Sequence, residues 1–217
     1  LFPSDVIRQP HMDREVIGPN DRYLGKYAAT IEDDLTAIPT LSLTMNQSDL
    51  FGSNGIYTNH QRRGFQWEKP VSFELFDASD KPCLQINAGI RLHGADGRSH
   101  AKKPFRIYFR GLYGTASMDF RLFPDANQTR FDRLILRPGA HDSFTSPHGR
   151  QSKEGLLVRD SFVRRSHQEM GGLSPHGRRV HLYLNGTYWG MYEIVERPDR
   201  FFFASHLGGH PDDYDVI

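Results

Sequence analysis

Apolar and polar residues alternate along five stretches of the middle of the chain, and this pattern predicts strands. Thr40–Met45 and Pro70–Asp77 place an apolar residue at every second position, as half-buried strands do. The same period continues through Leu84–Gly94, Pro104–Gly111 and Phe131–Gly139. We therefore expect several antiparallel strands that turn one face toward a core.

The period changes after residue 155. Leu156, Leu157, Phe162, Val163 and Met170 recur at helical spacing, and Gly171 and Gly172 follow as a stop signal. This stretch predicts the one long helix of the chain, with its apolar stripe packed on the sheet.

A hairpin is predicted between His181 and Val195. Asn185-Gly186 separates two apolar, aromatic runs, and this dipeptide suits a type I′ turn because both central residues take positive φ. Pro198 cannot donate a ladder hydrogen bond, so the second strand should end just before it.

Together these elements predict an α+β fold, with a curled antiparallel sheet, one main packed helix and a closing β-hairpin. Residues 1–38 are mixed and polar with scattered prolines, so we expect a lead-in or linker with at most one short helix near residues 31–37. Residues 39–217 then form the domain.

Charge and composition exclude some partners. The 217 residues contain 27 Lys+Arg and 26 Asp+Glu, for a formal net charge of +1, which gives no global attraction to nucleic acid or an anionic membrane. No apolar run approaches the roughly 18 residues of a membrane span. The single cysteine excludes an internal disulfide.

Two lysines are the first candidates for ligand binding. A glycine-containing turn precedes Lys102 and Lys103 at the start of a predicted strand, where an ammonium could meet a phosphate. Lys103 is the first choice and Lys102 the second. The alternative is a solvated strand face formed by both lysines and Arg106. The glycine spacing matches neither a P-loop nor a dinucleotide-binding loop.

Asp160 is a second candidate, in the predicted helix beside Arg159. It could turn inward and pair with a strand lysine. The alternative is an exposed ion pair with Arg164, one helical turn further on.

The eleven histidines show no metal-binding spacing, so we expect them to be solvent-facing. Trp67, Trp189 and Tyr192 could stack on a carbohydrate, although core packing is the simpler interpretation of these aromatic residues.

Four segments carry a family resemblance: "AKKPFRIYF", "LLVRDSFVRRSHQEMG", "HLYLNGTYWGMYEIVERPDRFFFASHLGG" and "DDYDVI". In this order they resemble the CotH kinase family, named for spore-coat protein H. The most specific part is the run Asn-Gly-x-Tyr-x-Gly-x-Tyr-x-x-x-Glu.

The resemblance implies a protein-kinase-like N-lobe that binds ATP with Mg or Mn and phosphorylates proteins such as coat proteins. It also implies a secreted or cell-surface bacterial protein, with the spore coat as one location. Lys103 would meet the nucleotide phosphates from the strand that also carries Arg106, and Asp160 could pair with Lys103. Arg159 matches a family arginine, and Glu196 would lie at the hinge near the adenine or ribose.

In the family pattern, the catalytic Asp and the metal-binding residues are expected after Ile217. We therefore expect these residues to be the N-terminal part of a kinase-like domain, inactive alone and with too little ATP affinity to raise the melting temperature. The alternative is a non-catalytic binding or scaffold module of a large bacterial surface protein. The sequence leaves the protein substrate and the oligomeric state open.

Overall fold

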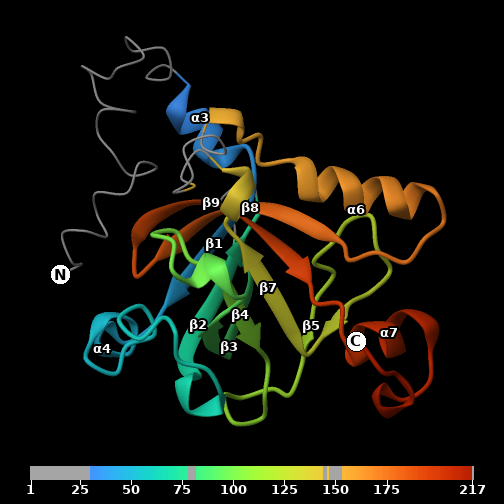
Figure 1. The fold of residues 1–217 in the computed structure, drawn as a ribbon, viewed down its shortest axis with the longest axis horizontal. Helices are drawn as coiled ribbons and strands as arrows, with labels where there is room; N and C mark the ends of the chain where they lie inside the picture. Colours follow the sequence, from blue (N-terminus) through green and yellow to red (C-terminus); the bar gives the residue numbers. More distant parts are fainter. Residues whose placement is uncertain (1–29, 78–81, 144–145, 147–152, 217) are drawn as a thin grey trace.

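The protein is a closed β-barrel with helices on its outside (Figure 1). The computed structural model describes residues 30–77, 82–143, 146 and 153–216. Seven strands close the barrel in the order β1-β2-β3-β4-β7-β9-β8. Their bounds are Thr40–Thr44 (β1), Lys69–Phe76 (β2), Pro82–Leu92 (β3), Phe105–Tyr108 (β4), Arg133–Arg137 (β7), Gly177–Leu184 (β8) and Thr187–Glu196 (β9). A separate ribbon pairs β5 (Met118–Asp119) with β6 (Arg130–Phe131).

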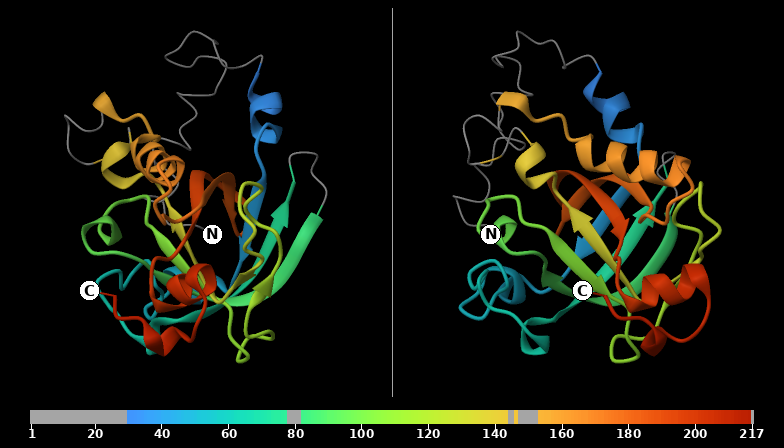
Figure 2. Two further views of the ribbon diagram at one scale, coloured as in Figure 1. Left: turned by 90° about the vertical axis from the view of Figure 1, so that its right-hand side faces the viewer. Right: turned by 45° about the vertical axis from the view of Figure 1, so that its right-hand side comes forward.

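The helices are short. They are α3 (Ile31–Thr36), α4 (Gln47–Phe51), α6 (Arg159–Glu169) and α7 (Arg200–Leu207), with 3₁₀ turns η2 (Phe65–Trp67), η3 (Asp96–Arg98), η4 (Ala140–Asp142) and η5 (Pro211–Asp213). Figure 2 shows that α6 crosses outside one end of the barrel, whereas α7 packs beside the other end. The predicted short helix near residues 31–37 is confirmed as α3, and residues 1–29 of the predicted lead-in lie outside the described residues.

The predicted alternation of the strands is confirmed by burial. Val71, Phe73 and Leu75 of β2 point inward, and Phe105 and Ile107 do so on β4. These side chains fill the barrel together with Trp189 and Tyr192, which are both fully buried. Core packing is therefore the correct interpretation of Trp189 and Tyr192.

The barrel closes where the first strand meets the predicted hairpin. Residues 40–43 of β1 pair in parallel with residues 181–184 of β8 along one edge of β1. Along its other edge, β1 pairs antiparallel with β2. The turn reinforces this seam, because the Asn185 amide N–H donates to Leu43 O (2.8 Å) and the Asn185 side chain accepts from Met45 N (2.8 Å). Asn185 and Gly186 have φ of 49° and 76°, which confirms the predicted turn.

The predicted fold class is therefore wrong. An open, curled antiparallel sheet of a protein-kinase-like N-lobe leaves two edges, whereas this sheet is mixed and closed. The decisive contact joins residues about 140 positions apart in the chain. Local periodicity reports which face of a strand is buried but carries no signal for such long-range pairing.

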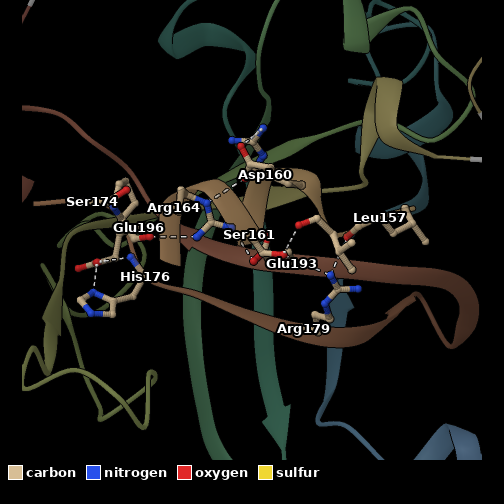
Figure 3. A network of polar contacts seen from close by, with 12 residues as sticks. Leu157, Asp160, Ser161, Arg164, Ser174, His176, Arg179, Glu193 and Glu196 are labelled. Atoms are coloured by element: carbon tan, nitrogen blue, oxygen red, sulfur yellow. Dashed lines mark hydrogen bonds and ion pairs between the residues drawn. The ribbon is translucent and has the colours of Figure 1, made fainter. Parts of the chain in front are cut away.

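The predicted packing of the long helix is also wrong. The apolar stripe of α6 faces outward: Phe162 is 70% exposed and Met170 77% exposed. Polar contacts hold α6 instead (Figure 3), because Arg164 donates to Glu193 (2.5 Å) and to the Pro175 carbonyl (2.9 Å). Arg179 of β8 reaches the Leu157 carbonyl before the helix (2.6 Å). Among the described helices, none is long and apolar enough to cross a membrane.

Candidate functional site

A pocket rich in arginine lies on the outer face of the barrel. Its lining comes from the loop of residues 59–64, from β3 and β4, and from the turn η3 between those strands. The five arginines are Arg62, Arg63, Arg91, Arg98 and Arg106. The cavity measures about 140 Å³, and no described Asp or Glu lines it. We call these five residues and their cavity the arginine pocket.

Strand alternation places two of the arginines side by side. Ile90 and Leu92 of β3 point into the core, so Arg91 between them points outward. Arg91 and Arg106 occupy paired positions on β3 and β4. Like charges in directly opposite positions are destabilising, which makes this arrangement costly unless an anion or hydrogen-bond acceptor lies nearby.

The two arginines share few protein acceptors. The Tyr108 hydroxyl oxygen accepts from both Arg91 and Arg106, and Nη2 of Arg106 lies 2.5 Å from Nδ1 of His93. Arg91 also pairs with Glu68 (3.4 Å), whereas Arg106 pairs with no carboxylate among the described residues. Among the described residues, the buried Nε of Arg106 has no hydrogen-bond partner. Buried donors are nearly always satisfied, so this nitrogen points to a missing acceptor.

Backbone carbonyls hold Arg98, which is buried, whereas Arg91 and Arg106 are half-buried. Arg98 of η3 donates to the carbonyls of His60 (2.7 Å), Leu92 (2.8 Å) and Arg62. These bonds fix the loop of residues 59–64 against the barrel. They leave the positive charge of Arg98 without a described carboxylate partner.

Neighbouring groups report the positive potential. Burial, followed by the charges of Arg197, Arg137 and Arg98, lowers the pKa of His93 to about 4. Burial and the charges of Arg63 and Arg91 lower the pKa of Arg98. Burial is the largest cause of both shifts, and the guanidinium charges add to it because cations disfavour a further proton in their vicinity.

Lys102 and Lys103 lie beneath this pocket rather than in it. Both are buried, so the interpretation as a solvated strand face is wrong for them. Nζ of Lys103 donates to the carbonyls of Arg98 (2.8 Å) and His100 (2.9 Å), and thereby supports the turn that carries Arg98. Lys102 donates to the Met191 carbonyl (2.6 Å). Of the predicted site residues, only Arg106 lines the pocket.

The predicted residues of α6 form surface ion pairs. Asp160 pairs with Arg164 (2.9 Å), as the alternative interpretation expected, and with Arg137 (3.1 Å). Arg159 binds Asp142 (2.9 Å), whose carboxylate also accepts from the backbone N–H of Leu156. The proposed pairing of Asp160 with Lys103 is therefore replaced by these arginines.

Glu196 lies at the end of β9, where Figure 3 shows it beside His176. Its carboxylate accepts from His176 Nδ1 and His206 Nε2, each at 2.9 Å. Burial alone disfavours its ionisation, but the hydrogen bonds from His206 and His176 outweigh burial and lower the pKa of the carboxyl. Nucleotide contacts by Lys103, Arg159, Asp160 and Glu196 stay predictions.

Sequence reasoning missed four of the five pocket arginines. Arg62 and Arg63 follow each other in a loop without periodicity, and Arg98 lies in a turn. Arg91 carried a usable signal, because it occupies an outward position on a predicted strand opposite Arg106.

The structure is a closed β-barrel with an arginine-lined pocket beside β3 and β4. Comparison with known proteins supplies the family. Residues 90–217 match the family described as CotH kinase protein, and this segment includes Arg91, Arg98 and Arg106. The chain therefore belongs to the CotH kinase family, whose members are kinase-like or spore-coat-related proteins. A search of curated proteins finds no match.

Proposed function

We propose that the chain binds the phosphate groups of ATP in the arginine pocket, as part of a protein kinase of the CotH family that acts on proteins such as coat proteins. The supporting observation is the partnerless buried Nε of Arg106, within a pocket lined by five arginines and no described acid. Guanidinium groups bind phosphate oxygens through charge-assisted, often bidentate hydrogen bonds.

The size of the pocket supports phosphate rather than a whole nucleotide as its ligand. Its volume of about 140 Å³ is below the roughly 300–1,000 Å³ of typical small-molecule sites. A larger groove of about 760 Å³ lies on the other side of η2 and is lined by Phe65 and Tyr113. The base and sugar of ATP would occupy this groove.

A protein-bound Mg²⁺ or Mn²⁺ does not fit the arginine pocket. Magnesium in proteins is typically held by one or two carboxylates together with substrate phosphates. Asn59 is the only amide that lines the cavity, and no described Asp or Glu joins it. The pocket's arginines would neutralise the phosphate charge and orient the phosphates. The carboxylates that hold a metal ion for phosphoryl transfer would lie outside this pocket.

Trp67 provides a direct binding signal because it lines the arginine pocket, whereas the other tryptophan, Trp189, is fully buried in the core. We expect pyrophosphate and ATP to change Trp67 fluorescence. Arg106→Met should weaken pyrophosphate binding by about ten- to a hundredfold, since it removes one or two charge-assisted hydrogen bonds. A direct titration suits weak binding, which shifts the melting temperature little.

The matched control is Arg165→Met, which removes an arginine that is 73% exposed on α6. It should leave pyrophosphate affinity unchanged. Equal effects of the two variants would refute the pocket, and so would an unchanged fluorescence signal at millimolar ligand. A gain in affinity from pyrophosphate to ATP supports the groove, and its absence contradicts it.

The second candidate is a non-catalytic binding module at the cell surface. The exposed apolar stripe of α6 favours it, since large exposed apolar residues that gather on one face mark interaction sites. Transfer of radiolabelled phosphate from ATP by the full-length protein with Mg²⁺ or Mn²⁺ distinguishes the two. Transfer supports the kinase, and ATP-independent function supports the module.

A further inference from the structure

Two histidines and a buried glutamate meet where β9 ends and α7 packs against the barrel. His176 Nδ1 lies 2.9 Å from one carboxylate oxygen of Glu196, and His206 Nε2 lies 2.9 Å from the other. The three side chains offer one ligand atom each, all within 4.8 Å of one another. We call this set the His-Glu-His cluster. In Figure 1, α7 lies on the opposite side of the barrel from α4, so the cluster is separate from the loop that follows α4.

The three residues come from different segments, and backbone hydrogen bonds and a helix cap hold them in place. Glu196 N–H donates to the His176 carbonyl (3.1 Å), and His176 N–H donates to the Glu196 carboxylate (2.8 Å). His206 lies on α7, whose first turn is capped by the Asp199 side chain. The two imidazole rings stack with their centres 5.9 Å apart, and the centre of the Phe202 ring lies 4.5 Å from the centre of the His206 ring. The cluster is therefore preorganised before any ligand binds.

Burial and access suit an ion. The Glu196 side chain is 4% exposed, whereas His176 and His206 retain 17% and 15% of their side-chain exposure. The carboxylate thus lies at the bottom of the cluster and the imidazoles at its rim. Arg133 and Arg197 line the same small cavity as Glu196, and Asp199 pairs with both of them, at 3.1 Å and 2.8 Å.

We propose that His176, Glu196 and His206 bind a divalent transition-metal ion of the zinc type, such as Zn²⁺, which fastens α7 to the end of the barrel. Two imidazole nitrogens and one carboxylate form a ligand set that zinc uses, with a fourth position left for water. Ligand atoms bound at about 2.1 Å to a tetrahedral ion lie about 3.4 Å apart. The two contacts of 2.9 Å go to different oxygens of the Glu196 carboxylate, and one ligand atom from each residue lies within 4.8 Å of the other two. Small side-chain rotations would bring the three ligand atoms to the tetrahedral spacing.

Imidazole ligands distinguish this ion from Mg²⁺ and Ca²⁺, which prefer oxygen. The two nitrogens that now donate to Glu196 must give up or relocate their protons when the metal binds. The metal ion therefore competes with protons for these nitrogens.

A second group, Asp96 with His100 and His141, has the same ligand types but a carboxylate that faces solvent. Asp96 is 63% exposed and lies 3.3 Å from each imidazole. This group serves as an internal comparison, since it contains one carboxylate and two histidines without the buried base of the His-Glu-His cluster.

The test uses Co²⁺ as the probe, because its visible absorption reports the coordination geometry, followed by competition with Zn²⁺. We expect one Co²⁺ per chain with the strong absorption of a four- or five-coordinate site at neutral pH. His206→Gln should weaken binding at least about tenfold, more than the loss of an outer-shell partner. Glu196→Gln should also weaken Co²⁺ binding, because it removes the carboxylate charge while the side chain keeps nearly the same size.

His141→Gln is the matched control and should retain the Co²⁺ spectrum. His206 lies at the rim of the cluster, so we expect His206→Gln to stay folded, and circular dichroism checks this. The test therefore holds even where Glu196→Gln proves unstable. Absence of the Co²⁺ absorption would overturn the proposal. Retention of the absorption in His206→Gln, or its loss in His141→Gln, would also overturn it. None of these results bears on the arginine pocket.

Discussion

Lys102 is an unusual residue, because it is a buried lysine in the segment between η3 and β4. Only 5% of it is exposed, its amine donates to the Met191 carbonyl, and it lies 4.7 Å from the centre of the Tyr192 ring. Burial lowers the pKa of this amine to about 7. Its charge is therefore destabilising in the native protein wherever the amine is protonated.

Lys102→Met should flatten the pH dependence of stability in alkaline solution. Between about pH 7 and 10.4 the unfolded lysine keeps its proton while the native lysine has lost it, so the free energy of unfolding rises with pH. The rise should total a few kcal/mol at most, and the variant should lack it. Urea unfolding of both proteins at several pH values measures the two slopes. Parallel slopes would show that the amine stays charged in the native state.

At the scale of elements, α6 is a helix held by its polar side. Arg164 is 11% exposed and joins Asp160, Glu193 and the Pro175 carbonyl, while the apolar residues of the helix face solvent. An amphipathic helix normally packs the other way round. Attachment through a few partly buried hydrogen bonds makes α6 sensitive to single polar substitutions.

Arg164→Met should lower the free energy of unfolding by about 1–3 kcal/mol, because it leaves Glu193 partly buried without its cation. Phe162→Ser, on the exposed face of the same helix, should change it by less than about 0.5 kcal/mol. Hydrogen exchange of the amides in residues 159–169 locates the effect, and faster exchange is expected only in the arginine variant. The reverse ranking would mean that the apolar face is covered.

At the scale of the molecule, the seam between β1 and β8 turns a sheet into a barrel. Asn185 serves it twice, through its positive φ and through its side-chain bond to the Met45 N–H. These two contributions can be separated, since glycine tolerates positive φ whereas alanine does not.

Asn185→Gly should lower the free energy of unfolding by about 1–2 kcal/mol, the cost of an unpaired Met45 N–H. Asn185→Ala should cost about 1 kcal/mol more, because alanine pays for the left-handed conformation. Chemical denaturation of the two variants gives the difference. Equal losses would show that turn conformation contributes nothing to the seam.

Particular residues show how far the sequence leads. The positions of Phe73 and Ile107 in the core follow from a two-residue period, which is a local property. The turn at Asn185 is local too. The partner of Leu43 is Leu184, which no local pattern indicates, so barrel closure was missed. His206 meets Glu196 only because α7 folds back, and the spacing of histidines along the chain conceals that contact.

The seam also makes the folded unit of this chain longer than the segment that matches the family. The family match begins at residue 90, near the end of β3, whereas the barrel begins with β1 at residue 40. A truncated chain that started at residue 90 would leave β4 and β8 each without a neighbouring strand. Unpaired strand edges recruit other chains, so such a truncated chain would tend to aggregate. The segment that evolution leaves recognisable is thus shorter than the segment that can fold, and a boundary near residue 39 keeps the barrel whole.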